Sequence, residues 1–147
     1  MMAPSFVNKV ILITGAGSGI GRATAIKLSS LGGACALQDI NPSSLAETQF
    51  LCSTSSKQEH LTSAFDVSST SSVNEFVSLV MDKHGRIDHV FNCAGINPTS
   101  LKTEEISDEY WDKIMNVNLK YIASPNLTPP LIPRSIEIEF FANFSIS

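Results

Sequence analysis

The sequence has few basic residues and no long apolar run. Ten lysines and arginines stand against fourteen aspartates and glutamates in 147 residues, giving a net charge of -4 at pH 7. Without a basic stripe the chain has little to displace counterions from a phosphate backbone, so no nucleic-acid partner is expected. The longest early apolar run, Val10–Ile13, is far short of the ~20 residues of a spanning helix, so no membrane segment is expected.

Cysteine is also scarce. Cys35, Cys52 and Cys93 are odd in number and show neither C-x-x-C nor metal-ligand spacing. The first eight residues lack the charged and apolar regions of a secretory signal. We therefore expect reduced thiols, no metal site and a cytoplasmic protein.

Apolar, strand-like segments alternate with helical patterns over the first 120 residues. Strands are predicted at 9–14, 34–39, 61–67 and 87–92, and helices at 21–31, 43–52, 72–84 and 107–119. Asn41 is expected to cap the second of these helices. Strand-helix alternation of this kind predicts an α/β fold, a Rossmann-type, doubly wound parallel sheet with right-handed crossovers.

The character of the chain changes after Lys120. Residues 121–147 hold four of the seven prolines, too many for a further helix or central strand. We expect a partial α/β unit over residues 1–120 with only four strands, and an unrelated, irregular tail over 121–147. The segment 87–92 would then be an apolar edge strand that promotes aggregation, unless the alternating segment 136–140 docks on it.

The stretch Thr14–Gly21 reads TGAGSGIG and stands between a predicted strand and a predicted helix. Glycine permits a tight turn and close approach to a pyrophosphate, and the helix N-terminus offers unpaired N–H groups. The string fits G-x-x-x-G-x-G through Gly15, Gly19 and Gly21, whereas G-x-G-x-x-G would place its last glycine on Ile20. This context favours a dinucleotide-binding loop over a glycine-rich turn without a ligand.

Two aspartates follow predicted strands. Asp39, at the end of the second strand, is placed to accept hydrogen bonds from ribose hydroxyls and to repel a 2′-phosphate, so NAD is expected in preference to NADP. Arg22 is the nearby cation that would weaken this preference. Asp66, after the third strand, is placed to face the adenine ring. Each has a simpler alternative, Asp39 as a cap of the next helix and Asp66 as a cap of the turn at 68–72.

Over about residues 8–120, four motifs in order resemble the short-chain dehydrogenases/reductases. The glycine string is similar to that family's TGxxxGxG loop, and Asp66–Val67 is similar to its adenine-contact pair. Asn92–Gly95 resembles its NNAG element with Cys93 in place of the second asparagine, and the fourth motif is a helix described below. The resemblance implies a nicotinamide-dependent oxidoreductase that interconverts secondary alcohols and ketones of a small molecule. The cofactor-binding residues it implies are Gly15, Ser18, Gly19, Ile20, Gly21, Asp39, Asp66, Val67, Asn92, Ala94 and Gly95.

A predicted helix near the end of the matched region resembles the one that carries the family's catalytic asparagine, which maps to Asn118. Its implied role is a supporting one, to help hold a water. Proton transfer in the family relies on a serine and on Tyr-x-x-x-Lys. The two tyrosines here, Tyr110 and Tyr121, are followed four residues later by Ile114 and Pro125. We therefore expect no turnover by the chain as written.

Three functional hypotheses follow. The chain descends from such an oxidoreductase; or it is a non-catalytic nucleotide-binding or interaction protein that pairs with a full-length relative; or it is a truncated or misspliced product without a function of its own. The resemblance leaves substrate and oligomeric state open, because the family's substrate loops and association helices follow the matched region.

Overall fold

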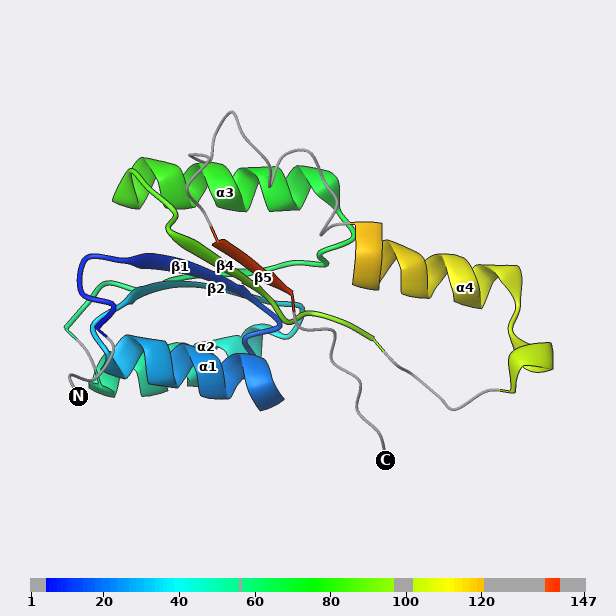
Figure 1. The fold of residues 1–147 in the computed structure, drawn as a ribbon, viewed down its shortest axis with the longest axis horizontal. Coiled ribbons are helices and arrows are strands. Elements are labelled where there is room, and N and C mark those ends of the chain that lie inside the picture. The colour runs from blue at the N-terminus through cyan, green and yellow to red at the C-terminus, as the bar shows by residue number, and fades with distance from the viewer. Residues whose placement is uncertain (1–4, 56, 97–101, 121–136, 141–147) are drawn as a thin grey trace.

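The computed structural model describes residues 5–55, 57–96, 102–120 and 137–140, with a parallel sheet between two layers of helices (Figure 1). The strands are β1 (Val10–Thr14), β2 (Ala34–Asp39), β3 (Leu61–Ala64), β4 (His89–Asn92) and β5 (Glu137–Phe140). The helices are α1 (Gly19–Ser30), α2 (Pro42–Ser55), α3 (Thr70–His84) and α4 (Asp108–Met115). The strand order is β3-β2-β1-β4-β5, all pairs parallel, which confirms the doubly wound α/β class. No helix in these ranges is long and apolar enough to span a bilayer.

The central strand β1 is buried on both faces because it lies between two apolar layers. Successive side chains of a strand point to opposite faces. Val10 and Leu12 accordingly pack in the cluster that includes α3, and Ile11 and Ile13 in the cluster that includes residues of α1 and α2. Figure 1 shows α3 on one side of the sheet and α1 with α2 on the other. The uninterrupted apolar run of this strand is therefore explained by two-sided burial.

The ends of the helices follow the local signals in the sequence. Asn41 Oδ1 accepts from the backbone N–H groups of Ser43 and Ser44, at 3.0 and 3.1 Å, which confirms it as the cap of α2. Helix α3 ends at Gly85, whose φ of +69° is the left-handed conformation that glycine adopts readily.

The tail contributes a strand. The sheet has five strands, where four were expected, because β5 pairs with β4 in parallel register, Val90 opposite Ile138 and Phe91 opposite Glu139. This is the docking that the alternation of residues 136–140 allowed. The edge of β4 that was expected to be open is therefore covered, and the argument for aggregation through that edge no longer holds for the full chain.

Two elements end earlier than predicted. β3 stops at Ala64 instead of Val67, and α4 gives way after Met115 to a wider π-helical turn over Asn116–Lys120. The residues left outside the strand and outside the α-helix, Phe65–Val67 and Val117, line the cavity described below.

A buried histidine lies just before β3. His60 is 6% exposed, its Nδ1 accepts the Cys35 backbone N–H at 3.1 Å, and its Nε2 lies 3.3 Å from Ser29 Oγ. Burial lowers the pKa of His60, and a backbone hydrogen bond at Cys52 opposes this only in part. The ring is therefore held neutral, with Nδ1 serving as an acceptor.

We expect the free energy of unfolding to be level between about pH 7 and about pH 8 and to fall as the pH drops below ~6.5, because the unfolded chain takes up a proton at His60 that the folded chain resists. Urea unfolding across this range measures the effect. The His60→Gln variant, which removes this titrating ring, should show a flatter profile. A wild-type profile that stays level to about pH 5.5 would contradict the assignment.

A second expectation concerns the covered edge. A chain ending at residue 136 lacks β5, so the backbone groups on one side of β4 lose their partners. Asp88 N–H donates to Val10 of β1, and N–H groups alternate in direction along a strand, so Val90 N–H also faces β1 whereas His89 and Phe91 N–H face β5. Hydrogen exchange of the His89 and Phe91 amides should become faster than in the full chain, that of Val90 should change less, and light scattering should rise with protein concentration. Unchanged exchange at His89 and Phe91 would show that β5 does not protect this edge.

Candidate functional site

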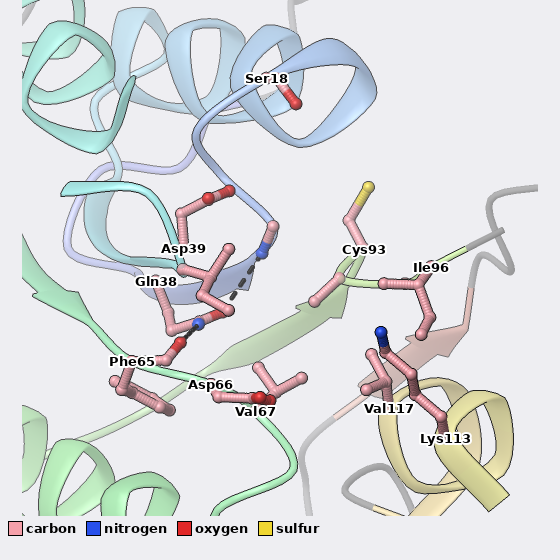
Figure 2. Close-up of a pocket in the computed structure, with 14 residues that line it drawn as sticks. Ser18, Gln38, Asp39, Phe65, Asp66, Val67, Cys93, Ile96, Lys113 and Val117 are labelled. Carbon is pink, nitrogen blue, oxygen red and sulfur yellow. Dashed lines mark hydrogen bonds between the residues drawn. The ribbon is translucent and has the colours of Figure 1, made fainter. Parts of the chain in front are cut away.

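A cavity of about 420 Å³ lies where β1, β2, β3 and β4 end (Figure 2). Because parallel strands place their carboxyl ends at one edge, the segments that follow them converge there. The residues lining the cavity are Gly15, Ser18, Gln38, Asp39, Ile40, Phe65, Asp66, Val67, Cys93, Ala94, Gly95, Ile96, Lys113 and Val117.

Two glycines let the loop after β1 turn tightly against its neighbours. A Cβ at Gly21 would lie 2.1 Å from the Gly15 carbonyl oxygen, which no side chain tolerates. Gly15 has a φ of +65°, and a Cβ there would lie 2.8 Å from Ala94 Cα. The loop therefore touches the end of β4 and starts α1 within a few residues, as its glycine spacing predicted.

The N-terminus of α1 is open to an anion. Ser18 precedes the helix, is exposed and makes no side-chain capping hydrogen bond, and the first turn contains no acidic residue. Gly19 and Ile20 form that turn but are not among the residues that line the cavity. Unpaired N–H groups together with the positive end of the helix dipole favour phosphate at this position.

Asp39 lines the cavity and also organises the glycine loop. Its Oδ2 accepts the Gly17 N–H at 2.7 Å, and its Oδ1 accepts the Asn41 N–H at 2.9 Å. A Cβ at Gly17 would lie 2.6 Å from Asp39 Cγ, so any other residue at position 17 would displace this carboxyl group. Asp39 thus contacts the cap residue Asn41, and it is Asn41, not Asp39, that accepts the N–H groups of α2. The Asp39 carboxylate is present in the cavity wall.

Arg22 is held away from the cavity. Its guanidinium donates to the Gly17 and Ser44 carbonyl oxygens and forms an ion pair with Glu47 at 2.9 Å. Arg22 is not among the lining residues, and Glu47 compensates its charge.

Asp66 and Val67 form the wall that follows β3. Asp66 Oδ1 accepts the Ser68 N–H at 2.8 Å, which confirms the alternative that it caps the following turn. Both residues also line the cavity, and Val67, 5% exposed, packs into the core cluster beneath it.

The end of β4 is tied to β1 by one hydroxyl group. Thr14 Oγ1 accepts the N–H groups of Cys93 and Ala94, each at 3.1 Å. Burial raises the pKa of the Cys93 thiol, and a hydrogen bond from the Gly21 backbone acts in the opposite direction. Asn92 is 3% exposed and is not a lining residue, and its Oδ1 has no partner among the described residues.

Asn118 lies in the π-helical turn and forms two hydrogen bonds with the segment that follows β4. Its Oδ1 accepts the Ile96 N–H at 2.8 Å, and its Nδ2 donates to the Ile96 carbonyl oxygen at 2.9 Å. Gly95 passes close by, since a Cβ there would lie 3.3 Å from Asn118 Oδ1. The side chain thus positions a backbone segment of the cavity and does not itself line the cavity.

Several lining residues were not anticipated from the sequence. Gln38, 1% exposed, directly precedes Asp39 in a strand of otherwise apolar buried residues, and such a polar exception is a usable signal. Lys113 and Val117 are four residues apart, the spacing that brings helical side chains together, and both reach the cavity from α4 and its π-helical turn. Across the described ranges, no three His, Cys, Asp or Glu side chains gather as metal ligands.

Known proteins match this arrangement. The family model described as short chain dehydrogenase matches residues 9–127. A levodione reductase from Leifsonia aquatica is 38% identical over 116 residues, covering 78% of this chain and 43% of that protein. The crystal structure of levodione reductase has a TM-score of 0.76 at 36% identity, covering 80% of this chain and 46% of that one. NAD+-bound xylitol dehydrogenase has a TM-score of 0.76 at 30% identity, covering 80% and 45%.

The chain spans less than half the length of these relatives. The matched part contains the glycine loop, the aspartate that ends β2 and the segment after β4. On the family match and the shared fold, this chain belongs to the short-chain dehydrogenase family, whose members are oxidoreductases that bind a nicotinamide dinucleotide.

Proposed function

We propose that the cavity binds NAD and that residues 1–120 supply the nucleotide-binding part of an oxidoreductase acting on secondary alcohols and ketones. The observation that carries this proposal is the Asp39 carboxylate, fixed at the end of β2 beside the glycine loop. In this position it accepts hydrogen bonds from the adenosine ribose, while the first turn of α1 receives the pyrophosphate. The expected reduced state of the three buried cysteines agrees with a cytoplasmic location.

The remaining walls fit the two ends of the same ligand. Phe65, Asp66 and Val67 would face the adenine ring, and the segment from Cys93 to Ile96 would face the nicotinamide. The bound cofactor would supply the hydride acceptor or donor, and the chain's own residues would bind and orient it. The relative whose structure contains NAD+ supports a dinucleotide of this kind.

The choice of NAD over NADP rests on charge. A 2′-phosphate would stand against the Asp39 carboxylate, and like charges in a partly desolvated site cost several kcal/mol. Arg22 does not offset this repulsion, since it is paired with Glu47. Among the lining residues the only lysine or arginine is Lys113, which lies on α4, across the cavity from Asp39 (Figure 2).

Calorimetry should give a tighter Kd for NAD than for NADP. Asp39→Asn keeps a hydrogen-bond acceptor but removes the charge. This substitution should raise the Kd for NAD about tenfold, the effect of losing one charged hydrogen bond. It should also reduce the ratio of the Kd for NADP to the Kd for NAD.

The matched control is Asp66→Asn, which removes the same charge from the other aspartate of the cavity. It should change the affinities for NAD and NADP by similar factors, because Asp66 faces the adenine and not the 2′-position. Equal affinity of the wild-type chain for the two cofactors would refute the role of Asp39.

Binding and turnover separate in this chain. None of its tyrosines is followed by lysine four residues later, and both amide groups of Asn118 are engaged by Ile96. Loss of a positioned general acid or base alone lowers the reaction rate by a factor of about 10²–10⁴. We therefore infer that the 147 residues bind the nucleotide without carrying out hydride transfer by themselves, as a non-catalytic nucleotide-binding protein would.

The purified chain should give no turnover above background with NAD and a panel of secondary alcohols, or with NADH and the matching ketones, as followed by NADH absorbance. The same preparation should bind NAD in the calorimeter, which excludes misfolding as the cause. Turnover that disappears on Asn118→Ala would show that the chain contains a working catalytic group.

A further inference from the structure

A buried amide joins two walls of the cavity. Gln38 lies opposite Thr14 in the register of β1 and β2, at the carboxyl ends of both strands. Its Oε1 accepts the Gly15 N–H at 3.3 Å, and its Nε2 donates to the Phe65 carbonyl oxygen at 2.5 Å, the two bonds dashed in Figure 2. Its own carbonyl oxygen accepts the Ala16 N–H at 2.9 Å. One residue therefore connects the loop after β1 with the segment after β3.

This position requires an amide. Burying a polar side chain is costly unless its donor and acceptor are both satisfied, and here each has a backbone partner. Methionine has a similar volume but offers neither group, so it would leave the Gly15 N–H and the Phe65 carbonyl without this partner. A carboxylate accepts from Gly15 but has no hydrogen for Phe65, and it brings a charge into the site.

We propose that Gln38 is a positioning residue of the nucleotide site, an inference that rests on the proposed binding of NAD. Gln38 sets the spacing between the glycine loop, which receives the pyrophosphate, and Phe65–Val67, which faces the adenine. It acts through the Gly15 and Phe65 backbone groups. Ligands that span both walls depend on this spacing, whereas ligands that touch one wall depend on it far less.

Calorimetry on Gln38→Met tests this dependence with adenosine, ADP and NAD. Adenosine touches the adenine wall and Asp39, and ADP and NAD also reach the glycine loop. ADP and NAD should bind at least about tenfold more weakly than to the wild-type chain, and adenosine should change by about threefold or less. Val80→Ala, which truncates a fully buried side chain of α3 away from the cavity, controls for general destabilisation and should leave all three affinities near wild type.

The pH dependence of NAD binding by Gln38→Glu separates positioning through the two hydrogen bonds from a general contribution to the fold. When protonated, this glutamic acid donates to Phe65 and accepts from Gly15, as the amide does. The ratio of its NAD Kd to the wild-type Kd should therefore fall by about tenfold between about pH 7.5 and about pH 5.5. The described charged residues that line the cavity, Asp39, Asp66 and Lys113, are the same in both proteins, and the two proteins differ only at position 38.

The outcomes are distinct. A wild-type chain that binds no NAD refutes the proposed function and, with it, any positioning role. Wild-type binding with equal NAD affinity in Gln38→Met refutes the role of Gln38 and leaves the proposed function standing. Weak binding by Gln38→Met together with a ratio for Gln38→Glu that does not change with pH also counts against it, because general damage to the fold would produce that pattern. If Gln38→Met does not fold, the pH response of Gln38→Glu decides.

Discussion

The cavity depends on one close approach, between Gly21 and the Gly15 carbonyl oxygen. The 2.1 Å left for a Cβ means that α1 can begin beside the end of β1 only if position 21 has no side chain. Because α1 begins there, Ser18, which precedes its first turn, lines the cavity, and Ala25 and Ser29 are buried farther along the helix. The position of the helix N-terminus beside the cavity and the packing of its far end thus follow from one backbone contact.

Side chains, and not loop length, hold the walls of the cavity in place. Thr14 binds two N–H groups after β4, Gln38 binds one group on each side of β2, and Asn118 binds both backbone groups of Ile96. Each links segments distant in sequence through hydrogen bonds that exist before any ligand arrives. Such preorganisation reduces the ordering cost of binding, and it fixes the segments that carry the acidic lining residues Asp39 and Asp66.

The features that were predictable from the sequence are those encoded locally. The two-sided burial of β1, the glycine loop, and the caps at Asn41 and Asp66 follow from periodicity and turn chemistry within a few residues. Contacts between distant segments left no such trace. Asn118 and Ile96 are hydrogen-bonded although they are 22 residues apart in the sequence, and no helical or strand pattern specifies which backbone groups an asparagine will bind. The same holds for Gln38, whose backbone partners Gly15 and Phe65 are 23 and 27 residues away in the sequence.

The fifth strand supports the strand that leads into the cavity. β5 pairs with β4 along residues 89–92, so β4 is hydrogen-bonded to β1 on one side and to β5 on the other. The described lining residues come from segments that follow β1, β2, β3 and β4, together with α4 and its π-helical turn. Because a strand added at the sheet edge satisfies backbone groups of β4, it holds in place the strand from which Cys93–Ile96 enter the cavity.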